Sequence, residues 1–121
     1  MKIHFYSISK SDKIRYLVDA RIIDGSYVFD DKTFKNTTNY VKVNSNSHIT
    51  WKRLGSVNST MEFILNKTTK SRYSNESGLD FNLLIETTLI EVLDNKIKLV
   101  YKYYVDNSYV DEISIYLLLK D

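Results

Sequence analysis

The sequence contains no cysteine and no proline, and it has only three glycines and two histidines. Without cysteine it can form no disulfide and no thiolate metal site, which excludes a small disulfide-stapled fold and a cysteine nucleophile. Three glycines are too few for a phosphate-binding loop, a dinucleotide fingerprint or a Gly-x-Ser-x-Gly nucleophile turn, and none of these motifs occurs. No apolar run approaches the roughly 18 residues of a membrane helix. We therefore expect no membrane partner.

The sequence also has no large excess of positive or negative charge. Lys and Arg total 17 and Asp and Glu total 15, which gives a net charge of +2. Nucleic-acid-binding domains usually carry a larger basic excess on one face, so this balance argues against a nucleic-acid partner. Residues 1–10 alternate apolar and polar side chains and lack the apolar centre of a signal peptide, so we expect a cytoplasmic protein. The absence of Pro, the thirteen Lys against four Arg, and the many Asn, Ile and Tyr are typical of A- and T-rich coding and suggest a low-GC bacterial source.

The residue types that are abundant favour strands. The 121 residues fit one domain, predicted to span 1–121, and 43% of them are hydrophobic, which is enough for a core. There are twelve Ile, nine Val, nine Thr and ten Tyr but a single Ala. Because β-branched and aromatic side chains pack well on a pleated surface, we predict an all-β protein.

Alternation and turn residues predict the individual strands. The expected strands are 2–9, 14–23, 27–29, 34–43, 48–54, 57–66, a strand ending near Tyr73, 79–93, 96–105 and 110–119. Asp24-Gly25, 44–47, Asp94-Asn95 and 106–108 have the composition of tight turns. The segment 79–93 also fits a helical stripe, but its β-branched residues favour a strand. Eight to ten regularly spaced strands indicate a barrel or a sandwich.

Four blocks of sequence point to a family. They are WKRLGSVNSTMEF at 51–63, KSRY at 70–73, GLDF at 78–81 and KLVY at 98–101. Together they resemble the uncharacterised bacterial YwiB-like family over roughly residues 20–119. The matching positions are Arg53, Gly55, Phe63, Tyr73, Gly78 and Tyr101. The resemblance implies a calycin-like, lipocalin-like antiparallel meander barrel of about eight to ten strands, and it implies no activity.

If the strands close into such a barrel, alternation predicts what lines the interior. Three expected inward faces are Ile49, Trp51 and Arg53; Met61, Phe63 and Leu65; and Ile97, Leu99, Tyr101 and Tyr103. The candidate ligand-binding residues are Trp51, Arg53, Phe63, Tyr73, Tyr101 and Tyr103.

Arg53 is the most informative of these candidates. An interior guanidinium must meet a carboxylate or a ring face, because an unpaired buried charge is costly. Arg53 either grips an acidic ligand or, as we favour, pairs with an internal acid or stacks on Trp51 or a tyrosine.

Residues suited to catalysis or metal binding do not form a motif. His4 and His48 lie in different predicted strands, and the segment 106–111 lacks the ligand spacing of a calcium loop. Asp80, Glu86 and Glu91 could form a carboxylate pair, but nothing in the sequence brings them together. We expect no metal, no cofactor and no catalytic residue, and an enzyme is the less favoured reading.

Three functions remain, in order of preference. The first is a barrel that binds a small apolar or acidic molecule. The second is an interaction or structural module, for example a homodimer formed through tyrosine-rich strands. The third is weak single-strand nucleic-acid binding through Arg15, Arg21, Lys35, Lys42 and Lys52, with aromatic side chains stacking on bases.

Overall fold

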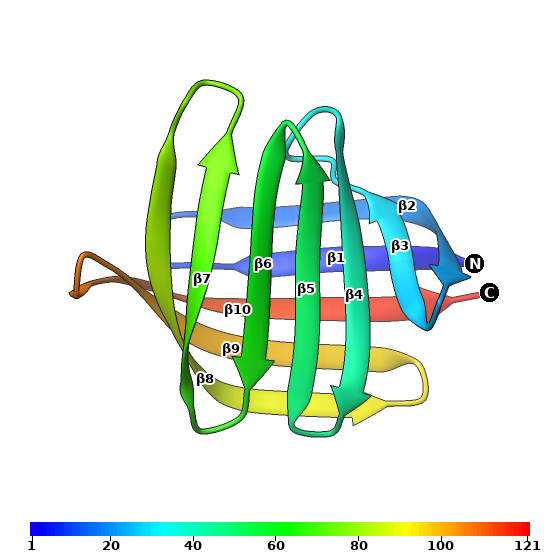
Figure 1. Ribbon diagram of the computed structural model, residues 1–121. Coiled ribbons are helices and arrows are strands. Elements are labelled where there is room, and N and C mark those ends of the chain that lie inside the picture. The colour runs from blue at the N-terminus through cyan, green and yellow to red at the C-terminus, as the bar shows by residue number, and fades with distance from the viewer.

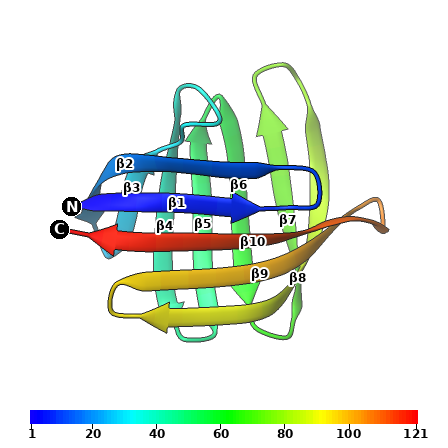
Figure 2. The ribbon, with the colours of Figure 1, turned by 180° about the vertical axis from the view of Figure 1, so that it is seen from behind.

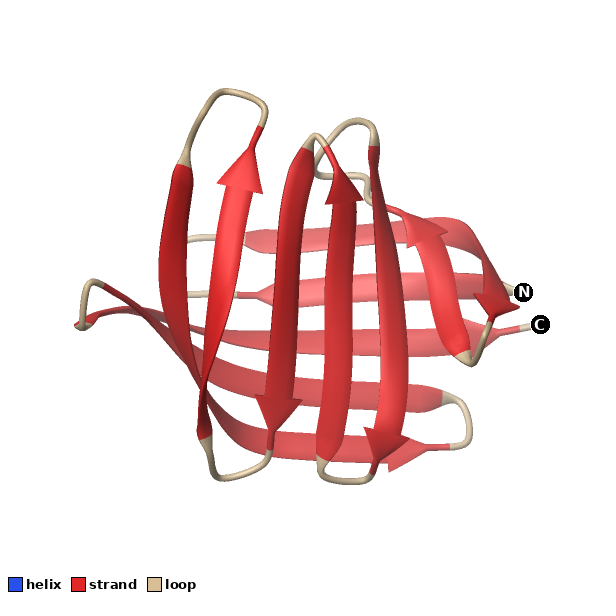
Figure 3. Cartoon of the chain, viewed as in Figure 1, coloured by secondary structure: helices blue, strands red, loops and turns tan.

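The computed structural model describes residues 1–121 and consists of ten β-strands joined by turns and short loops (Figure 3). The strands are β1 Lys2–Ile8, β2 Lys13–Ile23, β3 Ser26–Asp30, β4 Thr37–Ser45, β5 His48–Gly55, β6 Val57–Ile64, β7 Thr68–Asn75, β8 Asp80–Leu93, β9 Lys96–Val105 and β10 Ser108–Lys120. No helix of the length and apolarity needed to cross a membrane is present. The all-β prediction is confirmed.

The strands form a closed antiparallel barrel. Each strand pairs with the next along the chain, and β1 also pairs with β10, so that no edge is left unpaired. Figure 1 shows β4 to β7 as one layer that crosses a second layer made of β1, β2, β9 and β10, and Figure 2 shows the second layer from its own side. The predicted meander barrel is therefore confirmed, with ten strands.

Strand β8 belongs to both layers, because it is long and bends (Figure 1). Its pairing with β9 shifts between Thr87 and Leu89, where an extra residue, Thr88, leaves two consecutive side chains on the outside. Such a bulge increases the local bend of a strand. The stretch with the ambiguous helical pattern is thus a strand, as predicted.

Most predicted strand boundaries differ from the structure by two residues or fewer, and the start of β4 differs by three. The strand expected over 34–43 begins at Thr37, and residues 31–36 form a loop. Asp31 Oδ1 accepts hydrogen bonds from the amides of Thr33 (2.8 Å) and Phe34 (3.0 Å), and Asn36 has a φ of 53°. An aspartate that bonds the amides following it favours a turn over a strand.

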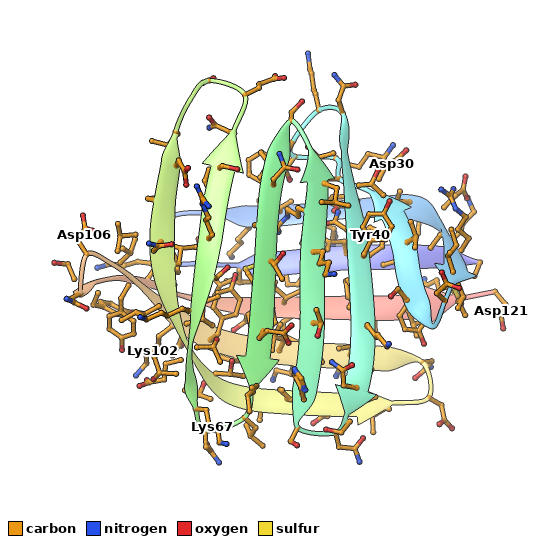
Figure 4. All side chains as sticks on the ribbon, in the orientation of Figure 1. Asp30, Tyr40, Lys67, Lys102, Asp106 and Asp121 are labelled. Carbon is orange, nitrogen blue, oxygen red and sulfur yellow. The ribbon has the colours of Figure 1, made fainter.

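A packed core surrounds Trp51 inside the barrel. The ring of Trp51 is 1% exposed and meets Phe5 and Phe29 edge-on, with ring centroids 6.3 Å away in both cases. Every strand except β7 contributes side chains to this core, and the three inward faces predicted from alternation do point inward. Outward positions are more polar; Figure 4 labels Tyr40 on β4 and Lys102 on β9 among the side chains on the outside.

Candidate functional site

The barrel holds a cavity of about 270 Å³ beside the β3–β4 loop. Eleven of its 16 lining residues are hydrophobic. The lining residues are Phe5, Ser7, Ile14, Asp31, Thr33, Phe34, Arg53, Ser59, Met61, Tyr73, Leu83, Ile85, Tyr101, Tyr103, Ile113 and Ile115. Several of them, including Phe34 and Tyr103, are only half-buried, so the cavity opens to solvent. A largely apolar hollow with a few polar groups is the usual form of a small-molecule site.

Arg53 supplies the positive charge of this cavity. It lies near the end of β5, and its Nε donates to Asp31 Oδ2 at 3.3 Å. The guanidinium carbon also lies 5.8 Å from the ring centroids of both Phe34 and Trp51. The Arg53 side chain is 17% exposed, and neither Nη group donates to a protein side chain. The ion pair and the two rings therefore fix the guanidinium while leaving its Nη edge free.

Asp31, the partner of Arg53, is held by several donors at once. Its side chain is 5% exposed, and Oδ2 accepts from Asn39 Nδ2 at 3.1 Å as well as from Arg53. Its Oδ1 accepts hydrogen bonds from the backbone amides of Thr33 and Phe34. Because four donors bind this carboxylate, Arg53 is not the only group that stabilises its buried negative charge. The Nη groups of Arg53, which make no hydrogen bond to Asp31, remain available to another acceptor.

A buried amide links this ion pair to the core. Asn39 is fully buried; besides donating to Asp31, its Oδ1 accepts from Trp51 Nε1 at 2.9 Å. Both polar ends of Asn39 are thus used. Buried polar networks in which every group is paired hold one geometry. The hydrogen-bonded series Trp51, Asn39, Asp31 and Arg53 therefore fixes the position of Arg53 in the cavity wall.

Ser59 adds a second polar group to the cavity wall. It faces inward on β6, directly opposite Arg53 on β5 and Tyr73 on β7. Ser59 is 6% exposed, and its buried Oγ has no hydrogen-bond partner in the protein. Unpaired buried hydroxyls are rare in folded proteins and call for an explanation.

Three tyrosines at or near the cavity, Tyr16, Tyr101 and Tyr103, have a raised pKa. Burial raises the pKa of Tyr101 to about 12, and it also raises the pKa of Tyr103, with a further contribution from the charge of Asp111. Tyr16, whose ring stacks on Phe5, has a raised pKa because of burial and then because of the charge of Asp31. The hydroxyl groups of these three residues therefore stay uncharged to a higher pH than an exposed tyrosine does.

The structure separates the six predicted site residues into two groups. Arg53, Tyr73, Tyr101 and Tyr103 line the cavity, whereas Trp51 and Phe63 are fully buried in the packed core. Sequence reasoning missed Asp31 and Ser59. Ser59 could have been found, because it shares the inward alternation of Met61 and Phe63. Asp31 could not have been found, because it lies between two predicted strands and its partner Arg53 is 22 positions away in the sequence.

The other candidate residues do not assemble into a site. Asp80 pairs with Arg72 and Glu91 with Lys96, and both acids lie on the outside of β8 together with Glu86. His48 Nε2 contacts Glu62, whereas His4 lies on the outside of β1. No group of three or more metal-ligating side chains is present.

The basic residues considered for nucleic-acid binding come from four different elements. Arg15 and Arg21 lie on the outside of β2, Lys42 on β4 and Lys52 on β5, and Lys35 lies in the β3–β4 loop. Lys42 and Lys52 lie on the outer face of the adjacent strands β4 and β5, whereas the start of β2, which carries Arg15, belongs to the opposite layer (Figure 1).

Comparison with known proteins identifies the family. The family model described as "Domain of unknown function (DUF1934)" matches residues 24–117. The chain belongs to this family. The crystal structure of the YwiB protein from Bacillus subtilis has the same fold, with a TM-score of 0.67 and 16% sequence identity over 99% of this chain and 91% of that chain. The YwiB-like resemblance is thereby confirmed. Among curated proteins, none matches the sequence.

At 16% identity, the likeness to the YwiB structure carries the fold and nothing about a ligand. The DUF1934 description likewise names no activity. The function of this family member therefore has to be argued from the cavity.

Proposed function

We propose that this protein binds a small, mostly apolar molecule that carries an acidic group, and that it does so without converting it chemically. One observation carries the proposal: a positioned arginine with a free Nη edge lies in the wall of an apolar cavity that opens to solvent. Arginine is the side chain best suited to hold a carboxylate or a phosphate, because its donors form a planar fork.

The cavity supports tight contact with a small ligand. Apolar surface removed from water contributes about 25 cal/mol per Å², and the aromatic lining offers such surface on several sides. A volume of about 270 Å³ lies just under the roughly 300 to 1,000 Å³ usual for drug-sized ligands. The ligand is therefore small, and a complete long-chain fatty acid or a flavin would extend beyond the cavity.

A thermal-shift panel of short organic acids, fatty acids, flavins and nucleotides tests the proposal. A ligand at 100 times its Kd adds about 2.7 kcal/mol to stability, which gives a clear rise in melting temperature. Ile113→Trp should abolish the shift, because Ile113 lines the cavity and the larger ring occupies it. Glu112→Trp is the matched control, since the neighbouring residue is exposed on the outside of β10. No shift with any class of compound would refute the proposal.

Self-association is the second candidate, and the outer face of the β1 layer favours it. Leu17, Leu93 and Leu118 are 37 to 53% exposed there, and the rings of Tyr6 and Tyr116 lie beside them, 5.8 Å apart. Lys96 and Lys98 flank Tyr116 on the same face, so two copies would bring like charges together. A dimer through this face should therefore strengthen with salt. Light scattering that gives a monomer at high protein concentration in both low and high salt would eliminate it.

The bacterial source and cytoplasmic location also stay predictions. Immunoblotting of fractionated cells would test the location.

A further inference from the structure

The unpaired hydroxyl of Ser59 indicates which acidic group the cavity takes, on the premise that the proposed function is correct. Ser59 Oγ is buried in the cavity wall, and Ser59 faces Arg53 across adjacent strands, which places the two Cα atoms about 5 Å apart. Both residues line the cavity. Together they offer donors to one acceptor group.

The form of these donors fits a planar head group. Two Nη groups of one guanidinium lie in a plane and match the two oxygens of a carboxylate, and the Ser59 hydroxyl can donate to one of those oxygens as well. The guanidinium cannot swing away to follow a differently shaped group, because Asp31, Phe34 and Trp51 hold it.

The charge around the cavity limits the ligand to a single negative charge. Asp31 already stands beside Arg53, so the pair is neutral before any ligand arrives. A second carboxylate, Asp111, is 8% exposed and close enough to Tyr103 to affect its pKa. A dianionic phosphate would add two negative charges next to these two carboxylates, with one arginine to offset them, whereas a carboxylate would add one.

The body of the ligand meets flat rings. Phe5, Phe34, Tyr73, Tyr101 and Tyr103 all line the cavity. Rings pack favourably against other rings in stacked or edge-on arrangements, in addition to the area they bury. We infer that the cavity binds a small aromatic monocarboxylate, with its carboxylate held by Arg53 and Ser59 and its ring among these aromatic side chains.

Isothermal titration with three compounds of similar size tests the head group. Benzoate is the proposed class, benzyl alcohol is neutral, and phenyl phosphate is dianionic near pH 8. We expect benzoate to bind at least tenfold more tightly than either of the others. Benzyl alcohol binding as tightly as benzoate would overturn the carboxylate inference while leaving a ligand-binding barrel. Phenyl phosphate binding more tightly would overturn the single-charge argument. If none of the three binds, and no other compound class does, the proposed function fails as well.

A matched pair of variants tests the role of Ser59. Ser59 and Thr87 both carry a buried hydroxyl without a partner, but only Ser59 lines the cavity. We expect Ser59→Ala to weaken benzoate binding about tenfold, because a hydrogen bond to a charged group is lost, and to leave benzyl alcohol binding unchanged. Thr87→Val should change neither affinity. Equal benzoate affinities in Ser59→Ala, Thr87→Val and the unaltered protein would show that Ser59 is not part of the head-group site.

Arg53→Lys provides a second check that keeps the positive charge. It should weaken benzoate binding, because an ammonium group does not offer the planar pair of donors. The melting temperature of the free variant shows whether it is folded. A folded Arg53→Lys protein with full benzoate affinity would contradict the planar-head-group argument.

Discussion

At the scale of single residues, Gly55 allows the turn between β5 and β6 to pack closely against the β3–β4 loop, which borders the cavity. Its φ is 138°, and a Cβ at this position would come within 1.9 Å of the carbonyl oxygen of Asn36. The same oxygen accepts a hydrogen bond from the amide of Ser56 at 3.2 Å. The turn between β5 and β6 is therefore seated directly against the loop that carries Asp31.

We predict that Gly55→Ala lowers the free energy of unfolding by about 3 kcal/mol or more, because the backbone must move to relieve the collision. Gly25→Ala is the control: Gly25 also has a positive φ, 78°, but no atom lies within 4 Å of its Cβ position. That variant should lose only about 1 kcal/mol. Urea unfolding measures both values, and equal losses would show that the contact with Asn36 has no energetic weight.

Buried tyrosines should make stability fall in alkaline solution. Burial raises the pKa of Tyr101 from 10.0 to about 12. As the pH rises above 10 the unfolded chain loses this proton first, so the unfolded state is favoured progressively until about pH 12. We predict that Tyr101→Phe removes about 1.4 kcal/mol per pH unit from the fall in unfolding free energy over this range.

Urea unfolding at several pH values between 9 and 11.5 measures this slope. Tyr40→Phe, on the outside of β4, is the matched control. A Tyr101→Phe protein with the slope of the unaltered chain would mean that the Tyr101 hydroxyl reaches solvent in the folded state.

The residue scale also shows what sequence reasoning could reach. Alternation placed Arg53, Tyr101 and Tyr103 inside the barrel, because a strand with a period of two leaves little choice of face. It could not separate the packed core from the cavity, so Trp51 and Phe63 were included among the site residues. Which inward side chains touch one another depends on how ten strands stack, and that information lies between segments far apart in the chain.

At the scale of elements, β8 shows why one pattern was ambiguous. The apparent helical stripe combines inward Phe81 and Ile85 with outward Leu84 and Leu89, and the bulge at Thr88 places Leu89 on the outside. Two apolar residues on the outer face were therefore enough to make a bent strand resemble a helix. The β-branched residues resolved the ambiguity correctly.

Strand β1 closes the barrel. Each of its seven residues faces one partner on β2 and one on β10. It also contributes Ile3, which is fully buried, and Phe5, which packs against Trp51. The match to the DUF1934 family begins at residue 24, after this strand, yet without β1 both β2 and β10 would have unpaired edges.

We therefore predict that a chain lacking residues 1–9 aggregates, because it exposes two strand edges and part of the core. A synthetic peptide of residues 1–9 added during refolding should restore a monomer, since the missing strand can pair in trans. A peptide with Ile3 and Phe5 replaced by Ser is the control and should not restore it. Size-exclusion chromatography separates these outcomes, and a truncated chain that stays monomeric without peptide would show that closure by β1 is dispensable.

At the scale of the whole molecule, most of the fold could be predicted, because turns of recognisable composition separate strands that pair in order along the chain. Nine of the ten pairings join consecutive strands, and only β1 with β10 joins the two ends. Ile3 faces Leu119 across that last pairing. Bringing such distant segments together costs more chain entropy than closing a hairpin, so this contact should form late in folding.

Folding kinetics can test this order with two equivalent substitutions. Ile3 lies in the closing pair, and Ile97 lies in the β8–β9 hairpin; both are buried, with exposures of 0% and 3%. Each change to Val should cost about 1 kcal/mol. If the hairpin forms before closure, Ile97→Val slows folding, whereas Ile3→Val leaves the folding rate unchanged and speeds unfolding about fivefold. Stopped-flow measurements in urea give both rates. If Ile3→Val slows folding and Ile97→Val only speeds unfolding, the pairing of β1 with β10 forms before the β8–β9 hairpin.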